Sequence, residues 1–131
     1  MATPSERVTL PPNNILVVDD EPMVAGTVRL VLEMNGQKVE LAENAETALE
    51  RFAPGKYGLV VTDFKLMAMD GLELAEKIRQ QSPTQPIILL TAYAESLRGD
   101  KQRLANVNCV LGKPFSVQQL LEALTSVLGG K

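Results

Sequence analysis

The chain contains no histidine, and it has a single cysteine, Cys109. The absence of histidine excludes a nucleophile of the Ser-His or Cys-His kind. It also nearly excludes a zinc site, because one thiol and no imidazole cannot supply the usual ligands. A lone cysteine cannot form an internal disulfide, and this predicts a reducing, cytoplasmic environment.

Long apolar runs and an excess of basic residues are also missing. No run approaches the ~20 apolar residues that span a bilayer, and the N-terminal residues show no signal-peptide pattern. A net charge of −3 and a pI near 5.0 argue against nucleic acid or an anionic membrane as a direct partner. The length of 131 residues, with 45% hydrophobic and 22% charged residues, predicts one globular domain.

Short apolar runs alternate with segments of helical periodicity over most of the chain. Strands are predicted at 15–18, 38–42, 59–62, 87–90 and 107–111, and helices over about 22–34, 45–53, 72–81, 94–105 and 117–128. This alternation is typical of an α/β domain with a parallel sheet, in which the most apolar strand, 87–90, would be central. The helix at 94–105 is expected to be weak, because Gly99 in its middle costs about 1 kcal/mol relative to alanine.

The ends of the chain differ in composition from this alternating region. Residues 1–13 are polar and rich in proline, and we expect a flexible N-terminal segment there. Residues 14–129 would form the domain, and residues 130–131 would be a short tail.

Polar side chains follow four of the five predicted strands: Asp19 and Asp20, Asp63, Thr91 and Lys113. Alone, each has an ordinary explanation, such as a helix cap or a solvated surface lysine. In a parallel sheet, however, the carboxyl ends of the strands share one edge, so these side chains could meet. Carboxylates ~4 Å apart repel by about 4 kcal/mol, and a site that gathers them needs a cation such as Mg²⁺. Without metal, at least one carboxylate should have a raised pKa, and Lys113 could pair with Asp63.

These residues lie in the segments VVDD (17–20), VVTD (60–63), LLTAYA (89–94) and GKPF (112–115). The ordered set resembles the receiver domain of two-component response regulators, of the chemotaxis-regulator type, and the resemblance covers about residues 14–129. It implies a flavodoxin-like doubly wound fold, with a five-stranded parallel sheet in the order 2-1-3-4-5 and helices on both faces.

The resemblance also implies roles for the residues. Asp63 would accept a phosphoryl group from a phosphohistidine on a sensor histidine kinase or a histidine phosphotransfer protein. Thr91 and Lys113 would contact the phosphoryl oxygens.

The same resemblance implies a bound Mg²⁺, for which Mn²⁺ could substitute. Asp20, Asp63 and the backbone carbonyl of Lys65 would be ligands, and Asp19 would help to position the ion. The site would make the chain a signalling phosphoacceptor with weak self-phosphotransfer and autophosphatase activity, rather than an ordinary enzyme.

Phosphorylation would switch a face built from the fourth helix, the fifth strand and the fifth helix. An unknown output partner or a fused output domain would bind that face, and the chain would be a monomer or a phosphorylation-dependent dimer. The sequence departs from the family pattern in two places. Met67 and Ala68 stand where proline is common, and Val110 replaces the usual aromatic residue three positions before Lys113.

Three other interpretations fit parts of the sequence. The chain could be a degenerate receiver that binds partners without phosphorylation, although the complete set of five residues argues against this. A phosphohydrolase of the haloacid dehalogenase type usually has a second acid two residues after the nucleophile, where this chain has Lys65. A flavodoxin-like cofactor binder would need a glycine-rich phosphate loop after the first strand, and Asp-Asp stands there instead.

Overall fold

The structure is a computed structural model in which residues 12–129 are described. Five parallel strands form one sheet in the order β2-β1-β3-β4-β5. The strands are β1 (Asn14–Val18), β2 (Lys38–Ala42), β3 (Leu59–Asp63), β4 (Ile87–Thr91) and β5 (Cys109–Gly112). The predicted fold class and strand order are therefore confirmed.

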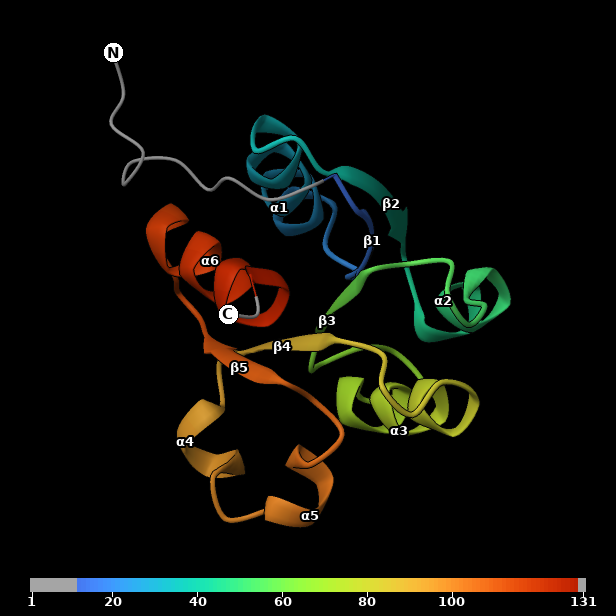
Figure 1. Cartoon of the computed structure of the whole chain (residues 1–131). Coiled ribbons are helices and arrows are strands. Elements are labelled where there is room, and N and C mark those ends of the chain that lie inside the picture. Colours follow the sequence, from blue (N-terminus) through green and yellow to red (C-terminus); the bar gives the residue numbers. More distant parts are fainter. Residues whose placement is uncertain (1–11, 130–131) are drawn as a thin grey trace.

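Helices cover both faces of the sheet (Figure 1). Helices α1 (Pro22–Met34) and α6 (Val117–Leu124) lie on one face, and the π-helix η2 (Thr125–Gly129) continues α6. The other face carries α2 (Ala45–Arg51), α3 (Gly71–Gln81), α4 (Ala94–Leu97) and α5 (Lys101–Leu104). We call residues 94–104 the α4–α5 segment.

The apolar side chains of the strands divide between these two faces because successive side chains of a strand point in opposite directions. Ile88 and Leu90 of β4 belong to the core under α1 and α6, whereas Ile87 packs against α2 and α3. Every residue of β3 and β4 is buried, as expected for strands covered on both sides. The two cores hold the carboxyl ends of these strands in fixed positions.

The α4–α5 segment differs from the single helix predicted over residues 94–105. The helix ends at Leu97, and a new helix begins at Lys101 after a break at residues 98–100. Asp100 starts the second helix, since its carboxylate accepts a hydrogen bond of 3.3 Å from the Arg103 N–H. The helix expected to be weak at Gly99 is therefore interrupted there, because Asp100, a good N-cap residue, follows the glycine directly and starts a new helix.

One prediction about the strands is wrong in detail. The fifth strand begins at Cys109 and not at residue 107, because the Val107 N–H donates to Leu104 O at 3.1 Å and belongs to the preceding turn. The strand at Ile87–Thr91 is buried and lies inside the sheet between β3 and β5, as predicted, with β3 as the middle strand.

The expected division of the chain into segments stays a prediction. Residues 1–11 and 130–131 lie outside the described residues. Within the described part, Asn13 accepts a hydrogen bond of 2.9 Å from Lys38 N–H and donates one of 2.9 Å to Gln37. No helix within residues 12–129 is long and apolar enough to cross a membrane.

Candidate functional site

The residues that follow the strands converge at one edge of the sheet. They line a pocket of about 540 Å³ whose walls include Asp20, Asp63, Lys65, Thr91 and Lys113. Their elements bring them there, because β1, β3, β4 and β5 run parallel and end at the same edge. The predicted convergence is present.

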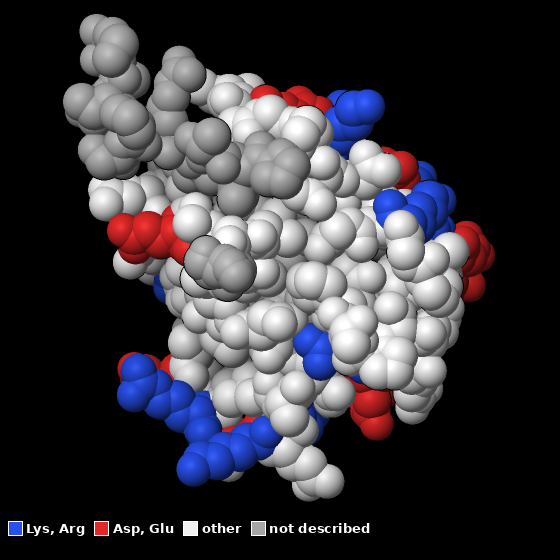
Figure 2. Space-filling model, viewed as in Figure 1, with Lys and Arg blue, Asp and Glu red and all other residues white. Residues whose placement is uncertain are grey.

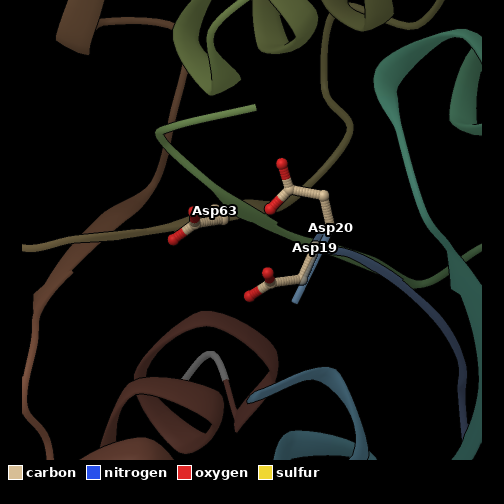
Figure 3. A group of neighbouring side chains, drawn as sticks. All are labelled: Asp19, Asp20 and Asp63. Carbon is tan, nitrogen blue, oxygen red and sulfur yellow. The ribbon is translucent and has the colours of Figure 1, made fainter. Parts of the chain in front are cut away.

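Three carboxylates form an acidic cluster in this pocket. Asp19, Asp20 and Asp63 each place one carboxylate oxygen within 4.8 Å of the others. Figure 3 shows their side chains pointing toward a common space. Asp19 and Asp63 are buried and Asp20 is exposed, so the cluster extends from the core to the surface. Such a group of oxygens suits a hard divalent cation that keeps some of its waters.

Asp19 lacks a partner for one of its two oxygens. Its Oδ1 accepts a hydrogen bond of 2.9 Å from the Glu21 N–H, whereas its Oδ2 is buried and has no hydrogen-bond partner within residues 12–129. Burial is the main reason that the pKa of Asp19 is raised to about 6, and the negative charges of Asp63 and Asp20 act in the same direction. The hydrogen bond from the Glu21 N–H and the positive charge of Lys113 oppose this rise in the pKa. The expectation of one raised carboxyl pKa is confirmed. An orphaned anionic oxygen beside two other carboxylates fits a bound metal ion.

Lys113 faces the acidic cluster from the far side of the pocket. Its Nζ lies 2.5 Å from Asp63 Oδ1, so the predicted ion pair is present. The Lys113 N–H donates to Thr91 O at 2.8 Å, and the Lys113–Pro114 peptide bond is cis. The pocket therefore places a carboxylate next to an ammonium group and beside a cation site, which is an arrangement that suits an anionic phosphoryl group.

The hydroxyl of Thr91 belongs to the buried wall of the same pocket. Its Oγ1 accepts a hydrogen bond of 2.9 Å from the Tyr93 N–H. Tyr93 is half-exposed at the rim, and its ring packs edge-on against Phe64, with 6.4 Å between the ring centroids. Thr91 thus connects the pocket to the chain that enters α4.

The loop at residues 64–70 follows Asp63 and carries two residues of interest. Lys65 lines the pocket. That its backbone carbonyl oxygen binds a metal ion stays a prediction. Ala68, at a position where proline is common, has a φ of 76°. This left-handed conformation is unfavourable for alanine by roughly 1 kcal/mol.

Sequence reasoning missed an ion pair at the end of this loop. Arg103 of α5 donates to both carboxylate oxygens of Asp70, at 2.6 and 2.7 Å. The N-cap of α3 could have been recognised from Asp70-Gly71, because Asp is a favoured N-cap residue. No local pattern connects Asp70 to a residue 33 positions away.

Comparisons with known proteins show which family the chain resembles. The family model described as "Response regulator receiver domain" matches residues 15–125. The aerobic respiration control sensor protein ArcB of Escherichia coli K12 is 35% identical over 88% of the chain, which corresponds to 15% of ArcB. The response regulator MprA of Mycolicibacterium vanbaalenii is 34% identical over 89% of the chain, which spans about half (51%) of MprA.

Solved structures show the same similarity. The response regulator TrrA of Thermotoga maritima, in complex with Mg²⁺-BeF, is 36% identical, with a TM-score of 0.81 over 88% of this chain and 98% of that one. The chemotaxis response regulator CheY4 of Vibrio cholerae is 29% identical, with a TM-score of 0.80 over 90% of this chain and 100% of that one.

Proposed function

The chain belongs to the family of response regulator receiver domains, and from this premise we propose that it accepts a phosphoryl group from a phosphohistidine onto Asp63. One observation carries the proposal. The carboxylates of Asp19, Asp20 and Asp63 lie within 4.8 Å of one another, and Lys113 Nζ lies 2.5 Å from Asp63. The solved structure of the similar TrrA in complex with Mg²⁺-BeF supports it.

In this proposal Asp63 is the nucleophile. A carboxylate oxygen attacks phosphorus, a P–O bond forms as the P–N bond to the donor breaks, and the imidazole leaves with the bonding electrons. Lys113 lies close enough to Asp63 to stabilise the negative charge of the transferring group. The hydroxyl of Thr91 accepts a hydrogen bond from the Tyr93 N–H, and its own O–H can still donate to a phosphoryl oxygen.

The acidic cluster would hold Mg²⁺ through Asp20, Asp63 and the backbone carbonyl of Lys65, while Asp19 positions the ion. The unpartnered Oδ2 of Asp19 supports this assignment, since a buried anionic oxygen needs a positive or hydrogen-bonding partner. When bound, the ion would supply positive charge opposite the phosphoryl oxygens. Mn²⁺ accepts the same oxygen ligands and could substitute.

The phosphorylated protein would return slowly to its resting state. The acyl phosphate on Asp63 is reactive, and the pocket opens to solvent beside the exposed Asp20, so water can reach the phosphorus. The chain would therefore show weak autophosphatase activity. It remains a signalling domain, whose product is a change in its own surface.

The donor would be a sensor histidine kinase or a histidine phosphotransfer protein. The receiving partner, or a fused output domain, would bind the face formed by the α4–α5 segment, β5 and α6. ArcB is named as a sensor protein and MprA as a response regulator, so relatives occur in both kinds of longer protein. A monomer or phosphorylation-dependent dimer and a cytoplasmic location remain predictions.

The direct test is incubation with acetyl phosphate and Mg²⁺, followed by measurement of the intact mass. We expect the wild-type chain to gain one phosphoryl group that hydroxylamine removes, because hydroxylamine cleaves acyl phosphates. The Asp63→Ala chain should gain none. Asp100→Asn is a matched control, since Asp100 is another aspartate that caps α5 outside the pocket.

Each other outcome has a defined meaning. An unchanged wild-type mass with several donors would contradict the proposal and favour a receiver that binds partners without phosphorylation. Steady turnover of many phosphomonoesters would favour a phosphohydrolase. A phosphoryl group retained by Asp63→Ala would place the acceptor elsewhere.

A further inference from the structure

Two ion pairs link separate elements of the fold, and both involve the loop that follows the proposed phosphoacceptor. Lys113, between β5 and α6, pairs with Asp63 at the start of the loop. Arg103, in α5, pairs with Asp70 at the end of the loop. The other two ion pairs within residues 12–129 are local, and each joins residues three or four positions apart in the sequence. The loop is therefore held at each end by a cation from the C-terminal part of the chain.

The contact between Arg103 and Asp70 is close and has a second anchor. Nη2 of Arg103 donates to both oxygens of Asp70, at 2.6 and 2.7 Å. Asp70 Oδ1 also accepts the Glu73 N–H at 2.8 Å and so caps α3. Burial acts to raise the pKa of Asp70, but the hydrogen bonds from Arg103 and Glu73 outweigh it and hold this pKa below its usual range. The carboxylate thus joins α5 to the first turn of α3.

The end of the loop also touches the backbone of the phosphoacceptor itself. The N–H of Gly71 donates to Phe64 O at 2.7 Å, and a Cβ at position 71 would collide with the carbonyl oxygen of Asp63. Gly71 follows Asp70, Phe64 follows Asp63, and these two neighbours are in direct contact. A displacement of Asp70 would therefore also displace Asp63.

The α4–α5 segment has few other attachments. Leu97 of α4 is buried against Leu72 and Leu89, but α5 contains no buried residue, and its Leu104 only borders this small cluster. Figure 2 shows Lys and Arg side chains gathered over this segment. The Arg103 side chain is 41% exposed, so its ion pair contributes little to global stability and matters mainly for position.

We propose that Arg103 is a positioning residue, whose ion pair with Asp70 fixes the phosphoacceptor loop and the α4–α5 segment relative to each other. The consequence is reciprocal. A change at Asp63 that moves the loop shifts the segment, and a partner that holds the segment stabilises one loop conformation. The part of this inference that concerns phosphorylation rests on the proposed function. The contact itself does not.

Hydrogen exchange of the unphosphorylated 131-residue chain tests the contact. Arg103→Gln and Asp70→Asn each remove the ion pair, and asparagine keeps the N-cap of α3. We expect exchange to rise about two- to fivefold at residues 64–71 and also at 94–106, since the pair restrains both regions. The double variant should exceed neither single variant, because the two changes break one interaction.

Two further variants distinguish the effect of the ion pair between Arg103 and Asp70 from a general effect of positive charge on the surface of the segment. Arg98→Gln removes an arginine of the same segment whose ion pair, with Glu95, is local and highly exposed. It should leave exchange at residues 64–71 unchanged. Arg103→Lys keeps the positive charge and should restore part of the protection. The proposal is wrong if Arg103→Gln affects only residues 94–106, or if the effects of the two single changes add.

A second arm of the experiment treats the chain with acetyl phosphate and Mg²⁺. It measures how far phosphorylation of Asp63 changes hydrogen exchange in the α4–α5 segment. In the wild type, we expect phosphorylation to alter exchange at residues 94–106. In Arg103→Gln, Asp63 should still take the phosphoryl group, but the change at 94–106 should fall to about a third or less. An undiminished change would overturn the inference. If the wild type takes no phosphoryl group, the proposed function fails, while the unphosphorylated arm still decides on the contact.

Discussion

The strands under the acidic cluster and the α4–α5 segment beside it differ in how deeply they are buried. All residues of β3 and β4 are buried, whereas those of β5 are partly buried and α5 has none in the core. Apolar burial dominates stability, so β3 and β4 hold the carboxylates on a rigid part of the fold, which we call the platform. Local unfolding of the neighbouring α4–α5 segment should cost less free energy. The difference teaches that the proposed phosphoacceptor site and the proposed partner-binding segment lie in parts of the fold that differ in stiffness.

The strongest test of this difference removes an equal side chain from each region. Leu90→Ala deletes a fully buried side chain of β4 and should lower the free energy of unfolding by about 2–5 kcal/mol. Leu104→Ala acts on a partly buried residue of α5 and should cost about 1 kcal/mol. Urea unfolding measures both. Equal losses would show that the segment is as firmly packed as the platform.

A second test concerns the charge buried in the platform. Asp19→Asn should raise the free energy of unfolding at neutral pH without metal by about 1–3 kcal/mol, because it removes an anionic oxygen that has no hydrogen-bond partner among the described residues. The folded pKa of Asp19 is raised from 3.8 to about 6, so the ionised form is the costly one. The gain in the free energy of unfolding should therefore be full above about pH 6, where Asp19 is ionised in the folded wild type. It should disappear as the pH falls toward about 4, where Asp19 becomes protonated.

The control for this variant is the same melt with excess Mg²⁺. Metal should stabilise the wild type more than Asp19→Asn and so reduce or reverse the gain. A gain that does not change with pH would mean that packing, and not the buried charge, explains the result.

The smallest expected effect comes from the break in the segment. A Cβ at Gly99 meets nothing within 4 Å, and its φ is not in the left-handed region. Gly99→Ala should therefore stabilise the chain by about 0.4–1 kcal/mol and slow exchange at residues 94–106. Gly36→Ala is the matched control of opposite sign, because Gly36 ends α1 at a φ of 85°. Destabilisation by Gly99→Ala would show that the break needs glycine.

The sequence predicted the features that depend on local patterns. Asp63 and Lys113 could be placed at one edge because each follows a short apolar run, and parallel strands share their carboxyl edge. The start of β5 was misplaced because Val107 looks like a strand residue, yet it packs in the turn beside Leu72 and Leu97. That packing depends on residues far away in the chain.

The link between Asp70 and Arg103 lay beyond sequence reasoning for a similar reason. In the sequence, Asp70 is an ordinary N-cap residue and Arg103 is an ordinary helix residue, and the broken helix brings α5 against the start of α3. The break depended on a competition between the entropy of Gly99 and the cap at Asp100. A weak helix was foreseeable, but its rearrangement into two was not.

Magnesium binding tests the central claim most directly. Titration of the chain with Mg²⁺ by calorimetry, together with thermal unfolding, should show one ion bound per chain and a stabilisation of about 2.7 kcal/mol at a hundredfold excess over Kd. Asp20→Asn should weaken both signals, and Asp100→Asn should change neither. A wild-type chain that shows no heat of binding and no stabilisation by Mg²⁺ would contradict the account.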